Sequence, residues 1–375
     1  MLKRFLSPLS ALVAMSLLLP TAAAQNAAAT PAGATQANLF AGSGNSGGPV
    51  LDNATQPGRN NSVTALDITI IESQSTNTAH DMDLQWQSVA AGMGHSATIV
   101  GQATLSSDAF MNTTDILIVS SGIIALSSTA VANIEEFMRR GGGVYISGEY
   151  LVTYTTNIAF ETIVTNMGGS FSWTGTTSGD LAPMAVVGSL QGTPNAVPPL
   201  PYYWYGTFAS ATATCEAFLS SAGLNYGFVF SPPNKCQGEL IQTSDQDWAR
   251  NPSGFIEPRL LMENIITRLT PDLKLRILGP CPGPVTVSVC GASPGGPVAF
   301  VTDTGLGSFT IPGGVVCAGT QLCLSGTNIK LRRTLAADGG GNITFGATVP
   351  AAACGVIYVE AVDLRRCTAS NVIKL

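Results

Sequence analysis

Hydrophobic residues follow two different periods along this chain, and the clearest case surrounds a glycine-rich turn. Residues 127–140 repeat apolar side chains at helical spacing and end in Arg139 and Arg140, cations that favour a helix carboxyl terminus. After three glycines, residues 144–146 form an uninterrupted apolar run, as expected for a strand covered on both faces. We therefore predict that residues 141–150 contain the central strand of an open α/β sheet and the turn that follows it.

The same patterns alternate along the rest of the first part of the chain. We expect further strands at residues 65–71, 96–100, 115–119 and 239–243, and further helices at residues 81–92, 158–167 and 258–269. This alternation implies right-handed crossovers and a flavodoxin-like, open and mostly parallel sheet with helices on both faces. Residues 171–235 depart from it, with short strands, one of them at 224–230, and proline-rich loops. We interpret them as a β-rich insertion.

The helical pattern ends near Pro271, and alternating apolar and polar residues replace it. Short strands are predicted at residues 285–290, 298–302, 308–311, 321–324, 330–334, 342–345, 356–362 and 371–375. Turn residues separate these strands, which is the pattern of an antiparallel β-sandwich. The predicted fold class is therefore α/β, with a C-terminal antiparallel β-sandwich as a second domain.

The first residues have the features of a secretory signal peptide. Lys3 and Arg4 precede an apolar run too short to span a bilayer, and small residues follow it before Gln25. Residues 25–64 lack periodicity and predict a disordered low-complexity leader. The expected organisation is a signal peptide at 1–24, this leader at 25–64, the α/β domain at 65–272 and the disulfide-bonded sandwich at 273–375. We expect a secreted protein, whether extracellular, periplasmic or at the cell surface, without a transmembrane anchor.

Composition narrows the partners of the mature protein. The net charge is −6, only 11% of the residues are charged, and the charges are spread along the chain. Because no basic stretch stands out, nucleic acid is not an expected partner, and neither is an acidic membrane surface. No cofactor is predicted apart from the divalent metal discussed below.

Two motifs carry a resemblance to a known family. The stretches DILIVSSG and RRGGGVYISGEY, separated by the amphipathic helix, resemble the class I glutamine amidotransferase-like fold, especially its divergent secreted members. In the catalytic members a cysteine occupies the strand-to-helix elbow and a histidine follows further along. Here Ser147 stands at the elbow and no histidine follows His95, so amidase activity is not implied. The C-terminal stretches CPGPVTVSV and ATVPAAACG resemble a small module of secreted bacterial proteins, which implies an accessory fold.

Candidate catalytic and metal-binding residues follow the predicted strands. Ser147 and Glu149 fall at the carboxyl end of the central strand, the edge at which open α/β sheets bind ligands. His80 is the candidate base for a Ser147 nucleophile, and the alternative is a surface histidine near a helix start. A second hypothesis is that His80, Asp81, Glu149 and Asp245 bind a hard divalent metal, although carboxylates at strand ends more often cap helices or face solvent.

A separate candidate binding surface is an aromatic run in the insertion, formed by Tyr202, Tyr203, Trp204 and Tyr205. Such rings can stack against a sugar or an extended peptide. The alternative is that they pack against the neighbouring β layer.

The eight cysteines predict disulfides, because the chain is expected to be exported and contains no Cys-x-x-Cys pair. The preferred pairings are Cys215 with Cys236, Cys281 with Cys317, Cys290 with Cys323, and Cys354 with Cys367. The other pairings of the last six cysteines stay open.

Two classes of function follow. The first is a non-catalytic binding or cell-surface protein that holds an extracellular glycan or peptide. The second is a secreted hydrolase, with or without a metal, at the edge containing Ser147, Glu149 and His80. The missing cysteine and downstream histidine of the family favour the binding protein.

Overall fold

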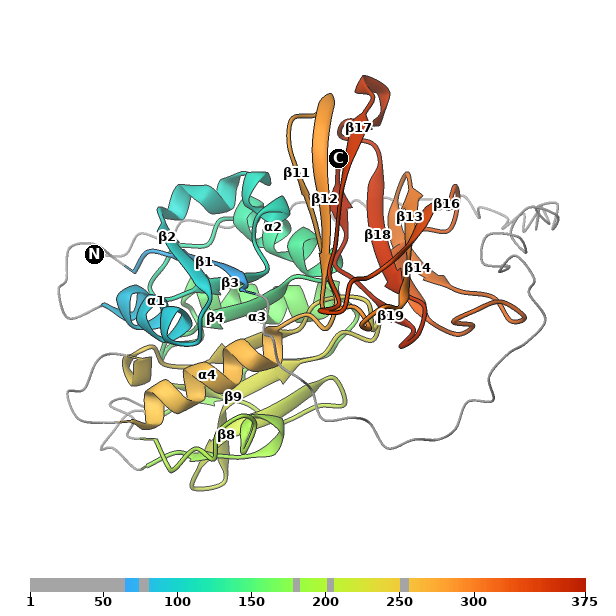
Figure 1. The fold of residues 1–375 in the computed structure, drawn as a ribbon. Coiled ribbons are helices and arrows are strands. Elements are labelled where there is room, and N and C mark those ends of the chain that lie inside the picture. Colours follow the sequence, from blue (N-terminus) through green and yellow to red (C-terminus); the bar gives the residue numbers. More distant parts are fainter. Residues whose placement is uncertain (1–64, 74–80, 178–182, 201–205, 250–255) are drawn as a thin grey trace, which may run out of the picture. The chain divides into compact units, whose positions relative to one another are not determined.

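The computed structural model describes residues 65–73, 81–177, 183–200, 206–249 and 256–375. Its largest element is an eight-stranded sheet of order β2-β1-β3-β4-β10-β9-β8-β6, shown in Figure 1. In chain order these strands are β1 (Asp67–Ile71), β2 (Ser96–Val100), β3 (Ile116–Val119), β4 (Gly143–Ser147), β6 (Ala185–Val186), β8 (Cys215–Ser221), β9 (Leu224–Phe230) and β10 (Leu240–Thr243). The first five strands of the order run parallel, and the other three are antiparallel to their neighbours. The predicted α/β class with a mostly parallel sheet is confirmed.

Helices cover both faces of this sheet. The helices are α1 (Met82–Gly92), α2 (Ser128–Arg139), α3 (Thr155–Asn166) and α4 (Glu257–Leu269). Side chains of α1 and α4 share one hydrophobic core with the sheet, and side chains of α2 and α3 share the other. Because both faces are covered, every residue of β3 and β4 is buried, which explains their uninterrupted apolar runs.

The aromatic centre of the first core is built around β4. Tyr145 points to the α1 side, where its ring lies 4.7 Å from that of Trp86 and 6.4 Å from that of Trp248. Val144 and Ile146 point to the opposite core. The period of two along β4 therefore divides its side chains between two layers of helices.

Helix α3 begins earlier than its hydrophobic pattern predicts, at Thr155 and not at residue 158. The Thr155 hydroxyl donates to the carbonyl oxygen of Ile124 and accepts from the backbone N–H of Leu126, both at 3.0 Å. These bonds join the first turn of α3 to the loop before α2. The helix start is thus set by a contact distant in sequence, which periodicity cannot show.

The insertion between α3 and β10 extends the main sheet. Strands β8 and β9 form an antiparallel pair that joins β10, so the predicted strand at 224–230 is confirmed. A separate two-stranded pair joins β5 (Gly175–Thr176) to β7 (Thr207–Phe208). Short 3-10 helices connect elements here and elsewhere: η1 (Gln102–Ser106), η2 (Ala109–Asn112), η3 (Gly188–Leu190), η4 (Asp247–Ala249) and η5 (Ala351–Ala353).

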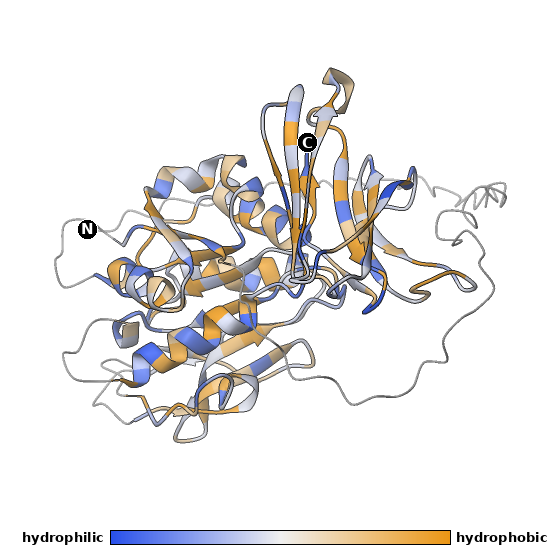
Figure 2. Cartoon of the chain, in the orientation of Figure 1, coloured by the Kyte–Doolittle hydropathy of each residue, from blue (hydrophilic) through white to orange (hydrophobic). Residues whose placement is uncertain are grey.

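The C-terminal region consists of separate antiparallel sheets. One contains β11 (Lys274–Leu278), β12 (Gly283–Cys290) and β17 (Ile343–Val349). Another contains β16 (Lys330–Ala336), β13 (Pro297–Asp303), β18 (Tyr358–Asp363) and β19 (Thr368–Ala369), with β20 (Ile373–Lys374) paired to β18. A third pairs β14 (Leu306–Thr310) with β15 (Gln321–Leu324). Buried and exposed residues alternate along β12, a pattern that Figure 2 shows as changing hydropathy.

Strand β11 is not among the predicted strands, and its charged residues explain why. Lys274 is buried and forms an ion pair with Asp115, at the amino end of β3. Arg276 forms ion pairs with Asp67, at the start of β1, and with Asp115. A buried lysine paired with a carboxylate looks like a surface residue in the sequence, because the partner lies far away along the chain. All described residues belong to one compact unit, Ala37–Leu375.

Two disulfides are present, Cys281–Cys354 and Cys317–Cys367. The predicted pairings of Cys281 with Cys317 and of Cys354 with Cys367 are therefore wrong. The amino end of β12 pairs with the carboxyl end of β17, so the loops that carry Cys281 and Cys354 meet at one end of that sheet. Antiparallel register, and not the order of the cysteines, selected this partner.

The remaining four cysteines are free thiols, so the predicted bonds Cys215–Cys236 and Cys290–Cys323 are not formed. Cys215 is buried in the α2 and α3 core, whereas Cys236 packs against the core of the C-terminal region. Cys290 ends β12 opposite Lys274. None of the described helices is long and apolar enough to cross a membrane.

Candidate functional site

The carboxyl ends of three neighbouring strands bring polar residues together. The chain leaves β3 at Ser120, β4 at Gly148 and β10 at Ser244, and β4 is hydrogen-bonded to both other strands. Gln246 joins two of these loops, because its Oε1 accepts from the backbone N–H of Gly122 at 3.0 Å. This edge is the predicted ligand edge of an open α/β sheet.

The loops meet closely enough to require glycine. A Cβ atom on Gly122 would overlap the carbonyl group of Gly148 and the side chain of Glu149. A Cβ atom on Gly148 would overlap Asn157 and the backbone of Thr243. The SSG and SGE motifs after β3 and β4 are thus needed for backbone approach.

Glu149 is held in place by a buried asparagine of α3. Its backbone N–H donates to Asn157 Oδ1 at 3.3 Å, and its carbonyl oxygen accepts from Asn157 Nδ2 at 2.6 Å. Asn157 Oδ1 also accepts from Gln242 Nε2 of β10 at 3.2 Å. Asn157 therefore joins α3, the loop after β4 and β10, a role that the sequence does not predict.

Glu149 is only 6% exposed, and the pKa of its carboxyl group is raised. Burial raises its pKa to about 7, and the negative charge of Asp247 acts in the same direction. The backbone N–H of Tyr150, which donates to Glu149 Oε2 at 3.1 Å, opposes the shift. The group therefore changes protonation near neutral pH, as a general acid or base at that pH must.

Beside Glu149 lies a surface that we call the edge patch, formed by Tyr150, Leu151, Val152, Tyr154 and Ile158. Four of these side chains are exposed, from 38% for Leu151 and Val152 to 50% for Ile158. The rings of Tyr150 and Tyr154 lie 5.9 Å apart. Burial, followed by the charges of Glu149 and Tyr150, raises the pKa of the Tyr154 hydroxyl, which places that ring within electrostatic reach of Glu149.

The predicted catalytic residues are only partly brought together. Ser147 lies two residues before Glu149, but its side chain is fully buried beside the Tyr145 hydroxyl. His80 lies outside the described residues, as do Tyr202–Tyr205 of the aromatic run and the signal peptide and leader at 1–64. Catalysis by Ser147 and His80 stays a prediction.

The predicted metal ligands make other contacts. Asp81 Oδ2 accepts from Gln85 Nε2 at 3.3 Å, one turn along α1. Asp245 is buried, and its Oδ1 accepts from the backbone N–H of Asp247 at 2.9 Å. In the part of the chain that the structure describes, no three His, Cys, Asp or Glu residues are grouped as metal ligands. A metal site that includes His80 stays a prediction.

Tyr150 and Tyr154 are the site residues that the sequence analysis missed. Tyr150 lies in the bend before α3 and Tyr154 is the N-cap residue of that helix, so a turn and not a helical repeat brings the rings together, and no periodic signal marked them. Neither tyrosine belongs to a hydrophobic core of the α/β region, and both keep part of the side chain at the surface.

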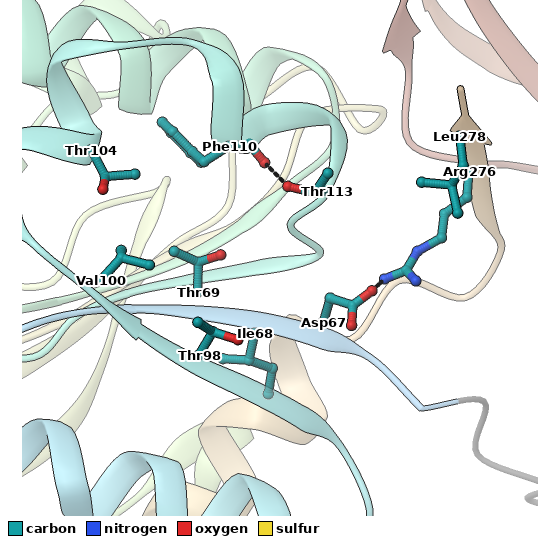
Figure 3. Close-up of a pocket in the computed structure, with 10 residues that line it drawn as sticks. All are labelled: Asp67, Ile68, Thr69, Thr98, Val100, Thr104, Phe110, Thr113, Arg276 and Leu278. Atoms are coloured by element: carbon teal, nitrogen blue, oxygen red, sulfur yellow. Dashed lines mark hydrogen bonds and ion pairs between the residues drawn. The ribbon is translucent and has the colours of Figure 1, made fainter. Parts of the chain in front are cut away.

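A cavity of about 380 Å³ lies away from this edge, where β1 and β2 face β11. Figure 3 shows Asp67 and Arg276 at one end of it and Thr69, Thr98 and Phe110 along its sides. The two charged groups form an ion pair with each other, which removes the charge that would select an ionic ligand. Its other polar groups are threonine hydroxyls, so the carboxyl edge offers more varied chemistry.

Similarity to known proteins is found among solved structures. The chain matches no protein-family model and no curated protein sequence. It is similar to a cytoplasmic protein of Salmonella typhimurium, with 14% identity, a TM-score of 0.40, and coverage of 55% of this chain and 99% of the other. A ThuA-like protein of Bacteroides uniformis has 15% identity and a TM-score of 0.37, covering 59% and 95%. A protein of Thermoplasma acidophilum that resembles part of GMP synthase has 14% identity and a TM-score of 0.37, covering 55% and 94%.

Proposed function

We propose that this chain is an exported, non-catalytic binding protein that holds a glycan at the edge patch. The scaffold is a divergent class I glutamine amidotransferase-like domain with a flavodoxin-like sheet, and the C-terminal region is an accessory β-sandwich. The observation that carries the proposal is the contact between exposed Tyr150 and half-buried Tyr154, beside the buried carboxyl group of Glu149.

The chemistry of this surface suits a sugar better than a peptide. Ligand sites combine apolar and aromatic contact area with a few fixed polar groups. Tyrosine rings offer flat faces against the C–H faces of a sugar ring, and the two hydroxyl groups, which interact with each other, can each make a further hydrogen bond. The patch lies on a loop and a helix and offers no strand for peptide pairing.

A glycan array followed by calorimetry with the best hit tests this proposal. The double variant Tyr150→Ala with Tyr154→Ala should lose about tenfold or more in affinity, since aromatic anchors dominate such interfaces. Val356→Ala is the control, because Val356 is also an exposed apolar residue but lies in the C-terminal region. Equal affinity of the double variant and the parent, or a hit only on a peptide array, would contradict the proposal.

A second candidate function is a hydrolase, and the raised pKa of Glu149 favours it. A carboxyl group with a pKa of about 7 can donate a proton to a leaving group at neutral pH, and burial and the charge of Asp247 both contribute to that raised pKa. A divalent metal at His80, Asp81, Glu149 and Asp245 belongs to this candidate.

Substrate screening separates the two functions. If the protein is a hydrolase, Glu149→Gln should abolish turnover while leaving folding and glycan affinity nearly unchanged. If it only binds, no substrate is turned over by the parent protein, and the edge-patch variants alone lose affinity. A thermal-shift screen with divalent ions, with Asp81→Asn as the control variant, tests the metal directly.

A further inference from the structure

Two free thiols from distant parts of the chain face each other. Cys236 lies in the loop between β9 and β10, and Cys323 lies in β15 of the C-terminal region. The Sγ of Cys323 lies 2.7 Å from the carbonyl oxygen of Cys236, and interaction with the Cys236 thiol is one cause of the raised pKa of Cys323, after burial. Cys323 is fully buried, and Cys236 is half-buried against the same core.

The loop that carries Cys236 is fixed on both sides. Toward the C-terminal region, Asn234 Nδ2 donates to the carbonyl oxygen of Gly307 at 3.2 Å, and the Lys235 N–H donates to Gln321 Oε1 at 3.2 Å. Toward the α/β region, the Gly238 N–H donates to the carbonyl oxygen of Met138 at 2.8 Å. The thiol of Cys236 is therefore held at β15 by contacts that do not depend on sulfur.

We propose that Cys236 and Cys323 form a third disulfide when the chain meets an external disulfide in an oxidising compartment, and that this bond joins the α/β region covalently to the C-terminal region. The Cys323 sulfur already lies against the backbone of Cys236, so rotation of the two side chains can bring their sulfurs to bonding distance. The sequence-based pairings with Cys215 and Cys290 are replaced by this one. Both of those cysteines would then remain free.

The reaction is a two-step exchange. The thiolate of Cys236, the more exposed of the two, attacks one sulfur of the external disulfide and releases one thiol. The thiolate of Cys323 then attacks the mixed disulfide at the Cys236 sulfur and releases the second thiol. Two S–H bonds are lost and one S–S bond forms. The external disulfide takes up both electrons and, as two thiols, both protons.

A buried carboxyl group, that of Glu360, lies beside the Cys323 backbone. Glu360 Oε1 accepts from the Cys323 backbone N–H at 3.2 Å, and the side chain is fully buried. Burial, followed by the charge of Cys236, raises the pKa of Glu360 well above its usual value, which favours the uncharged carboxylic acid. Burial also raises the pKa of Cys323, which agrees with Cys236 as the first nucleophile.

Peptide mapping of the exported full-length chain tests the proposal. The unreduced protein is denatured in iodoacetamide and digested with trypsin and chymotrypsin, and cleavage after Lys235 and Leu322 separates the two cysteines from the others. We expect a linked peptide pair containing Cys236 and Cys323, with carbamidomethyl label only on Cys215 and Cys290. Label on Cys236 and Cys323, with the Cys281–Cys354 and Cys317–Cys367 bonds intact, would overturn the proposal.

Thermal melting gives a second readout. Cys236→Ser and Cys323→Ser should each lower Tm by on the order of 5–10 °C, and the double variant should equal either single variant because one bond is lost in each case. Cys290→Ser is the matched control and should leave Tm nearly unchanged. Additive losses in the double variant would show independent packing effects and no bond.

Discussion

The α/β region and the C-terminal β region are stabilised in different ways. Every residue of β3 and β4 is buried, and large aromatic side chains fill the space between the sheet and its helices. In the C-terminal region most residues of β16 and β17 are exposed or half-exposed, and two disulfides close its loops. The large hydrophobic cores of the α/β region supply enough buried apolar area to stabilise it without disulfides. The smaller sheets of the C-terminal region bury less, so disulfides add to their stability.

The two regions also differ in where the buried carboxyl groups of Glu149 and Glu360 lie. The covered sheet of the α/β region can hold polar groups out of water at its carboxyl edge, where Glu149 acquires its high pKa. In the C-terminal region β12 alternates buried with exposed or half-buried residues, and the buried carboxyl group of Glu360 lies within β18 and not at the end of a strand. The two regions should therefore respond differently to the changes below.

The largest effect is expected from breaking the aromatic core of the α/β region. Trp86→Ala removes a fully buried ring that contacts Tyr145 and Trp248, and it should lower the free energy of unfolding by about 3–5 kcal/mol. Equilibrium unfolding in denaturant measures this change in the free energy of unfolding. Leu84→Ala on the same helix is the control, because Leu84 is 54% exposed and should cost little. A small loss for Trp86→Ala would show that the C-terminal region carries most of the stability.

Removal of a disulfide should destabilise mainly the C-terminal region. The double variant Cys281→Ser with Cys354→Ser opens a loop with a sequence separation of 73, and we expect a loss of about 2–4 kcal/mol. Hydrogen exchange should show faster exchange in β12 and β17 and little change in β3 and β4. Uniform acceleration over both regions would mean that they unfold as a single unit.

The pH dependence of stability should report Glu149. Its pKa is about 7 when folded and 4.5 as the ordinary value, so the folded state holds the proton more tightly. Below pH 4.5 both states are protonated, and the group has no effect. Between pH 4.5 and 7 the unfolded state loses this proton and the folded state keeps it, so the free energy of unfolding falls as pH rises, by up to about 3 kcal/mol in total above pH 7. Glu149→Gln should therefore stabilise the protein at pH 8 and flatten its stability between pH 5 and 8. An unchanged pH profile would show that Glu149 titrates normally.

The smallest effect is expected at a helix start. The Ser127 hydroxyl accepts from the Ala130 N–H at 3.2 Å and caps α2. Ser127→Ala should cost about 1 kcal/mol in the free energy of unfolding. Ser128→Ala, one residue later and also exposed, should stay within about 0.5 kcal/mol of the parent protein. Equal effects of the two changes would mean that the cap is not formed in solution.

The sequence by itself determined the local elements. Strands β2 and β9 and the helices α1, α2 and α4 lie where periodicity placed them, within one or two residues. These elements are encoded by nearby apolar residues and by helix-ending glycines, so a short window of sequence suffices. The candidate edge was predictable for the same reason, because Glu149 directly follows a strong strand signal.

The tertiary structure alone decided what depends on distant partners. The pairing of Cys281 with Cys354 follows from the register of β12 and β17, and β11 is held by carboxylates of the α/β region. The acidity of Glu149 depends on burial and on Asp247, and the position of its backbone depends on Asn157. None of these contacts leaves a local pattern, because each joins segments whose proximity arises only when the sheets and helices pack together.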